Sequence, residues 1–266
     1  MEKEAGRRGG KWRVAGLVLL GLVAFLAFLL ARAPADRIYG LAEPYLPGDV
    51  GLYGLSGSLW EGRATAVEAG GVRLHGLSWE LHAAALLTGG VSLDLAVEDR
   101  HLEMQALVER ELDGTLHLTV PRGRLAIPPL QGQTRWRHPA VEGEVFLRDL
   151  EATLADGGIQ RADGRITWRG AAVTVAQRAE LGDLEVTLET PEGGGTRGQV
   201  TELGEGPLEA DGTVSLSPAG RWQVDAMVEA TEPESVLGRS LAMMAEESAQ
   251  GGYRLRYSGR ITLPSF

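Results

Sequence analysis

The sequence predicts a mainly β protein, in which one N-terminal transmembrane helix precedes an elongated, curled antiparallel β-sheet domain with one short helix near the C-terminus. Three observations predict this class. An unbroken apolar stretch lies near the N-terminus, apolar and polar residues alternate repeatedly from Val50 onward, and Asp-Gly pairs interrupt the alternation. Alternation puts apolar side chains on one face of a strand, and half-buried strands of this kind are typical of antiparallel sheets.

The charge of the chain is divided unevenly. Residues 1–13 form a basic tail with five basic and two acidic residues, whereas residues 14–266 hold 21 basic and 34 acidic residues, a formal charge of −13. An acidic body of that size repels phosphates, so we expect no nucleic acid partner. The chain has no cysteine, which removes disulfides, thiolate metal sites and thiol nucleophiles.

Residues 14–31 are consecutive apolar or small residues, which predicts a transmembrane helix. At about 1.5 Å per residue this helix is roughly 27 Å long, close to the ~30 Å hydrocarbon core of a bilayer. Trp12 and Arg13 are the predicted membrane-interface residues, because the indole favours the headgroup level and the guanidinium can reach outward to water.

The flanking charges predict the orientation of this helix. Five basic residues precede it, and only Arg32 and Arg37 follow within the next fifteen residues. The positive-inside rule places the tail in the cytoplasm and the remainder in the periplasm, as a single-pass protein of the bacterial inner membrane. A cleaved signal peptide is the alternative, because Ala33-Pro34-Ala35 has the small-x-small form of a cleavage site.

Residues 32–49 are predicted as a linker, and residues 50–266 as the periplasmic β-rich domain. About a dozen alternating segments, roughly 8–14 residues apart, indicate an all-β meander. Asp-Gly pairs supply the positive φ that tight hairpins require. They occur at 113–114, 156–157, 163–164 and 211–212.

Two helical segments interrupt the meander. Ala83–Leu87 is predicted as a short helical turn, and residues 231–250 as the one longer helix of the domain. Thr231 and Glu234 have the spacing of a capping box, and Gly251-Gly252 ends the segment. Its apolar stripe predicts packing over the open end of the sheet, with docking to a partner as the alternative. The stripe consists of Leu237, Leu241 and Met244.

The sequence predicts no catalytic, metal-binding or cofactor-binding residue, and therefore no enzyme. The histidines lack a metal-binding spacing and are expected to face solvent from strands; they are His75, His82, His101, His117 and His138. Glu246-Glu247 is expected on the helix, facing solvent. A periplasmic enzyme stays an alternative, because carboxylates from separate strands can converge without a sequence motif.

Three segments of the sequence have a pattern more specific than simple alternation. Gly54–Gly62, with the sequence GLSGSLWEG, is followed by Leu77–Leu81, with the sequence LSWEL, and the chain later contains Gly252–Ile261. These segments resemble the type II secretion system protein N family, in which a Gly-x-Leu-Trp-x-Gly segment precedes a Leu-x-Trp strand. The resemblance implies an accessory inner-membrane component that supports export of folded periplasmic proteins across the outer membrane. It implies protein–protein contacts with other type II secretion inner-membrane subunits.

The same glycine-tryptophan motif also resembles segments of the larger AsmA-like envelope proteins. That likeness implies the alternative of a periplasmic lipid carrier or tether, with lipid as a candidate ligand. The residues themselves favour a structural role for Gly57, Trp60, Gly62 and Trp79. Glycine permits a bulge or a tight turn, and a tryptophan fills one end of a sheet as a large apolar body. Trp168 and Trp222 are predicted core residues for the same reason.

Overall fold

The computed structural model describes residues 32–42, 50–69, 72–127, 140–174, 177–244, 246–248 and 251–260. The predicted tail and transmembrane helix, residues 1–31 with Trp12 and Arg13, lie outside these ranges. Within the described ranges, no helix is long and apolar enough to cross a membrane.

The described strands form one antiparallel sheet of fourteen strands. They pair in chain order from β1 to β12, and β14 then lies between β12 and β13. The prediction of a mainly β antiparallel meander is therefore confirmed. The strands are β1 (Gly51–Gly57), β2 (Glu61–Ala69), β3 (Val72–Leu81), β4 (Val91–Glu98), β5 (Leu102–Arg110), β6 (Leu116–Ala126), β7 (Ala140–Ala155), β8 (Gly158–Thr174), β9 (Arg178–Glu189), β10 (Thr196–Glu202), β11 (Leu208–Leu216), β12 (Arg221–Ala230), β13 (Glu246–Glu247) and β14 (Tyr253–Arg260).

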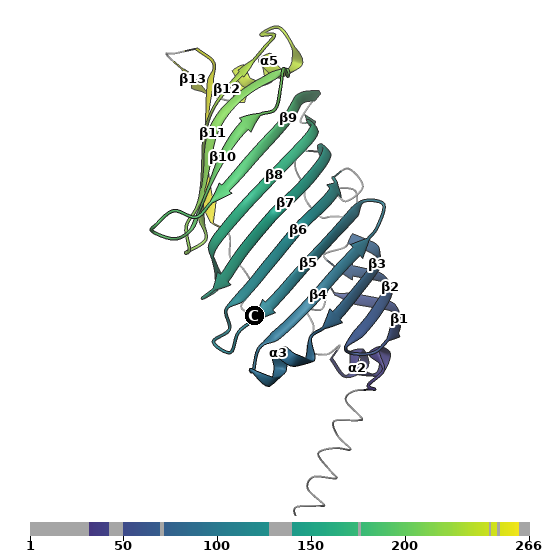
Figure 1. Cartoon of the computed structure of the whole chain (residues 1–266). Coiled ribbons are helices and arrows are strands. Elements are labelled where there is room, and N and C mark those ends of the chain that lie inside the picture. The colour runs from purple at the N-terminus through teal and green to yellow at the C-terminus, as the bar shows by residue number, and fades with distance from the viewer. Residues whose placement is uncertain are drawn as a thin grey trace, which may run out of the picture.

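Chain-order pairing makes the sheet long in the direction across its strands. Figure 1 shows the strands following one another from β1 at one end to the hairpins of β10–β14 at the other, with a continuous twist. At about 4.8 Å between neighbouring strands, such a sheet extends for roughly 60 Å. The twist has the usual origin in the right-handed twist of each strand.

Only two of the four Asp-Gly pairs form hairpin turns. Asp156 and Gly157 join β7 to β8 with φ values of 53° and 71°, and the pair at 113–114 lies between β5 and β6. The pairs at 163–164 and 211–212 lie inside β8 and β11, so their prediction as turns is wrong. Asp163 instead accepts hydrogen bonds from the backbone N and the hydroxyl of Thr190, both at 2.8 Å.

Three described helices accompany the sheet: α2 (Ala35–Ala42), α3 (Ala83–Leu87) and α5 (Val236–Met244). The short helix predicted at Ala83–Leu87 is α3, and it precedes β4. Helix α2 lies in the segment predicted as a linker and packs beside β1. The periodicity that predicts strands in the domain gives no signal for α2.

Helix α5 is shorter than the predicted 231–250. Thr231 does not cap it, because its hydroxyl donates to the carbonyl of Gly206 at 2.7 Å. Ser235 is the N-cap instead, and its hydroxyl accepts a hydrogen bond from the backbone N of Gly238 at 3.1 Å. The capping-box prediction at Thr231 is therefore wrong, because the helix begins about one turn later.

The end of this segment also differs from the prediction. Glu246-Glu247 forms β13, which pairs with Tyr253 and Arg254 of β14. A helix through these two residues is therefore wrong. Helix α5 ends at Met244, and the backbone groups of these two residues pair with β14 instead.

The sheet is a single layer over most of its area. No large side chain of the described residues is fully buried, and the buried hydrophobic residues are mostly alanines. The main buried cluster forms where α5 covers β9, β11 and β12, with Leu237 and Leu241 at 6% and 9% exposure. The predicted packing of this helix over the end of the sheet is what the described residues show (Figure 1).

Candidate functional site

Three of the four motif residues of the N-terminal segment lie in one row across the sheet. Gly57 is paired with Gly62, and Gly62 with Trp79 on the next strand. A Cβ at Gly62 would overlap the Trp79 ring, so the indole can lie flat only over a glycine. Gly57 has a φ of +88°, and a Cβ there would lie 2.5 Å from the carbonyl oxygen of Glu61.

Trp60, the fourth motif residue, lies in the turn between β1 and β2 and is half-buried. Its carbonyl accepts a hydrogen bond from the backbone N of Leu81 at 2.6 Å, and its own backbone N donates to the Ser58 hydroxyl at 3.2 Å. The Trp79 indole donates to the neighbouring carbonyl of Leu59 at 3.1 Å. The motif thus joins this turn to β3.

The same pairing of tryptophan with glycine occurs twice more along the sheet. A Cβ at Gly143 would lie 2.6 Å from the Trp168 indole nitrogen, and a Cβ at Gly259 would lie 2.7 Å from the Trp222 ring. Each indole lies against a glycine of a neighbouring strand. No short-range sequence signal predicts these pairs, because each glycine belongs to a different strand from its tryptophan.

The pairing register places apolar residues of neighbouring strands opposite one another. Together they form one continuous band, which we call the apolar row. Each member is the cross-strand partner of the next, and cross-strand partners share a face of the sheet. The row crosses thirteen strands and consists of Leu55, Ala64, Leu77, Val97, Met104, Gly123, Leu147, Ile166, Val186, Val200, Gly212, Ala226 and Leu255. All of its members are buried or half-buried.

The next row along the strands faces the other side of the sheet, and we call it the polar row. Its members are mostly exposed and all but one are polar or charged. They are Ser56, Arg63, Ser78, Ala96, Gln105, Arg122, Arg148, Arg165, Thr187, Gln199, Thr213, Asp225 and Arg256. The two rows show that the sheet has one apolar and one hydrophilic face over nearly its whole length.

The two edges of the sheet differ. At β1, the segment containing α2 covers the edge: Pro34 forms a β-bridge with Ser58, and the Tyr39 hydroxyl accepts a hydrogen bond from the backbone N of Leu52 at 3.1 Å. Helices and loops that cover an edge strand prevent it from pairing with other chains. The β1 edge is therefore covered at its two ends, at Leu52 and at Ser58.

At the opposite edge, β13 covers only the first two residues of β14. In this hairpin the backbone N of Ser248 donates to the carbonyl of Gly252 at 3.0 Å, so the N–H of Arg254 points toward β13. By alternation, the N–H groups of Arg256 and Ser258 point away from β12, and no described residue pairs with them. The open edge thus runs from Leu255 to Arg260.

The described histidines lie beside carboxylates on the surface. His82 Nε2 is 2.6 Å from Asp94 Oδ2, and this hydrogen bond raises the pKa of His82. His75 lies 3.1 Å from Asp99, and the hydrogen bonds from His101 and His75 lower the pKa of Asp99 although burial raises it. His138 lies outside the described residues. Among the residues that the structure describes, no group of three or more His, Cys, Asp or Glu could hold a metal ion.

Comparison with known proteins gives two findings. The family described as "Type II secretion system (T2SS), protein N" matches residues 48–256. The chain is 28% identical over 256 residues to the type II secretion system protein N of Aeromonas hydrophila, and the match covers 92% of this chain and 98% of that one. No solved structure matches the chain.

Proposed function

Because this chain belongs to the type II secretion system protein N family, we propose that it is an accessory inner-membrane component of the type II secretion system. In this role it supports export of folded periplasmic proteins across the outer membrane. The family match over residues 48–256 carries the proposal. Residues 14–31 anchor the chain with residues 1–13 in the cytoplasm, and the β-sheet domain lies in the periplasm.

The domain acts through protein–protein contacts at the open edge of β14. An exposed strand edge binds an extended segment of another protein by continuing the ladder of backbone hydrogen bonds. The outward N–H groups of Arg256 and Ser258 supply the donors for such a ladder. Pro34 and Tyr39 already contact the β1 edge, which favours the β14 edge for this contact.

Charge adds selectivity to the edge. Arg254, Arg256 and Arg260 are all exposed on β14. Charged side chains on an edge strand discourage indiscriminate strand pairing, since a partner must compensate them. Asp225 forms ion pairs with Arg254 at 2.7 Å and with Arg256 at 3.5 Å. We therefore expect the partner to be an extended segment with acidic side chains near Arg260.

The experiment is an affinity purification of the tagged chain from gently solubilised envelope, with both proteins and lipids identified. Secretion-system inner-membrane subunits in stoichiometric amounts, without enriched lipid, are the expected result. Stoichiometric phospholipid without secretion subunits would overturn the proposal.

A specific observation favours a second candidate function, a periplasmic lipid carrier or tether. The apolar row continues over thirteen strands, about 58 Å at the usual strand spacing, and most of its larger side chains are only half-buried. A face of this kind can lie against acyl chains over the length of the sheet. Helix α5 covers one end of this face, around Leu237 and Leu241. The lipid analysis of the same purification tests this function.

A further inference from the structure

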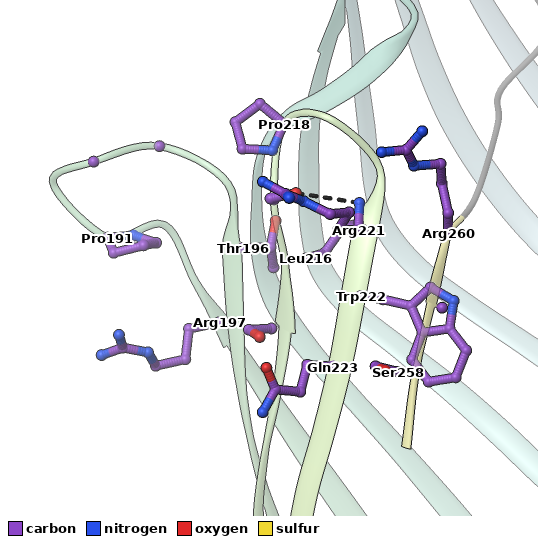
Figure 2. A pocket seen from close by; sticks show the side chains of 15 residues that line it. Pro191, Thr196, Arg197, Leu216, Pro218, Arg221, Trp222, Gln223, Ser258 and Arg260 are labelled. Atoms are coloured by element: carbon purple, nitrogen blue, oxygen red, sulfur yellow. Dashed lines mark hydrogen bonds between the residues drawn. The ribbon is translucent and has the colours of Figure 1, made fainter. Parts of the chain in front are cut away.

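A cavity of about 760 Å³ lies at the end of the sheet between β10, β11, β12 and β14. It is closed on one side by the loop before β10 and on another by the turn between β11 and β12. Figure 2 shows the side chains around it. The polar residues of interest are Arg197, Ser217, Arg221, Gln223, Ser258 and Arg260.

The three arginines share the hydrophilic face of the sheet. Arg221 and Arg260 are cross-strand partners, and Arg197 lies in the row of Ser215, Gln223 and Ser258, the next hydrophilic row along the strands. Figure 2 shows Arg197 and Gln223 extending to the opposite side of their strands from the Trp222 indole. The three arginines come from three different strands and all line this cavity, and the Arg197 guanidinium points away from those of Arg221 and Arg260 in Figure 2.

This concentration of charge is uncompensated. The cavity lining contains no aspartate and no glutamate. Within the described part of the chain, none of the three arginines has a carboxylate within ion-pair distance, although Glu189 is the cross-strand partner of Arg197. Residues 14–266 are strongly acidic as a whole, so a cavity lined by three arginines and no carboxylate differs in sign from the net charge of its domain.

Opposed arginines also occur in the polar row, at Arg122, Arg148 and Arg165. However, Glu98 and Glu103 line the pocket beside Arg122 and Arg148, whereas no carboxylate lines this cavity. Like charges placed directly opposite each other on neighbouring strands destabilise a sheet. The pair formed by Arg221 and Arg260 is such a contact, at the very end of the β12–β14 ladder. A bound anion would remove the repulsion, and guanidinium groups bind oxyanions through paired hydrogen bonds.

We propose that this cavity is a binding site for a phosphate group carried by a small organic molecule or a lipid headgroup. A phosphate monoester has a charge of about −1.5 to −2 at pH 7 and three acceptor oxygens, so it suits the cross-strand guanidinium groups of Arg221 and Arg260 better than a single carboxylate does. The cavity is larger than a phosphate alone, so it also accommodates the group to which the phosphate is attached. The Gln223 amide and the Ser258 hydroxyl supply further hydrogen-bond donors.

The site is tested on the detergent-solubilised full chain by calorimetric titration at fixed ionic strength. The probes are inorganic phosphate, glycerol 3-phosphate, dihexanoyl phosphatidic acid, which keeps the phosphate monoester, and hexaglutamate. The variants are R221Q/R260Q, which removes the like-charge pair, and R221K, which keeps the charge but loses the planar donor pair. R122Q is the matched control, because Arg122 is an exposed arginine of the polar row that lies outside this cavity.

Glycerol 3-phosphate is expected to bind the wild type. Its affinity for R221Q/R260Q is expected to be at least tenfold lower, and its affinity for R122Q is expected to equal that for the wild type. Equal affinity for the soluble ester and the short-chain lipid assigns the site to free phosphate esters; at least tenfold tighter lipid binding assigns it to a headgroup. Both outcomes support the proposal. Binding that is absent, that is unaffected by R221Q/R260Q, or that is restricted to hexaglutamate would overturn it.

Thermal unfolding of each variant separates loss of the site from loss of the fold. R221Q/R260Q is expected to unfold at the same temperature as the wild type or higher, because the substitution removes a repulsion. R221K is expected to bind with intermediate affinity while its unfolding temperature stays unchanged. This result does not depend on the secretion role, because the titration contains no secretion subunit.

Discussion

The indole of Trp79 lies flat over Gly62 on the neighbouring strand, and a Cβ at position 62 would overlap its ring. This contact fixes β2 against β3 at the turn that also contains Trp60. It explains why a glycine and a tryptophan stand at these two positions, seventeen residues apart in a motif that is shared with a protein family.

Replacing Gly62 with alanine is expected to destabilise the domain by about 1–3 kcal/mol, because the Trp79 ring must move or leave its rotamer. Denaturant unfolding followed by tryptophan fluorescence measures the change. Gly193→Ala is the control, since a Cβ there meets no atom within 4 Å, and its effect should stay within about 0.5 kcal/mol. Equal effects of the two substitutions would show that the ring does not depend on Gly62.

Helix α5 is held by Leu237, which is 6% exposed among Leu208, Ala210 and Val228. Leu237→Ala is expected to reduce the free energy of unfolding by about 2–5 kcal/mol, because it leaves a cavity under the helix. Met243, on the same helix, is 80% exposed, and Met243→Ala should have little effect. Hydrogen exchange in α5 provides a second readout: faster exchange is expected only in Leu237→Ala.

The hydrogen bond to Asp94 raises the pKa of His82 from its ordinary value of 6.5. The charged imidazole therefore stabilises the fold below about pH 6.5, and this contribution is lost as the pH rises through the raised pKa. NMR titration of His82 in the wild type and in Asp94→Asn measures the shift. A His82 pKa that does not fall in Asp94→Asn would contradict the assignment.

Val186 and Thr187 are neighbours on β9 that face opposite sides of the sheet, in the apolar and the polar row respectively. If acyl chains lie along the apolar row, Val186→Gln should reduce the phospholipid that co-purifies with the chain at least twofold. Thr187→Gln should leave it unchanged. Equal lipid content in the two variants would remove the support that the apolar row gives to a lipid-carrying function.

The sequence predicts the strands well because each one carries its own alternation, as in Val91–Val97 and Trp222–Val228. It does not predict register, which depends on the geometry of every turn. Asp156-Gly157 forms a turn, whereas Asp163-Gly164 lies within a strand, where Asp163 bonds to Thr190. The apolar row follows from register, and therefore it could not be predicted.

The candidate sites have the same dependence on register. Arg197, Arg221 and Arg260 belong to three hairpin segments, and only pairing brings them to one cavity. The open edge could not be predicted either. The sequence predicts a helix through Glu246-Glu247, whereas these residues form β13, the last strand of the sheet. By contrast, the likeness of Gly54–Gly62 to a secretion family needs no register, since it is read from contiguous residues.

We propose that the open edge of β14 binds another secretion-system subunit. Ser258→Pro removes one outward N–H without breaking the ladder with β12, and Ser258→Ala keeps that N–H. The direct measurement is the amount of secretion-system inner-membrane subunits that co-purifies with each tagged variant. We predict normal recovery with wild type and Ser258→Ala and at least a fivefold loss with Ser258→Pro; equal recovery with all three would contradict the claim.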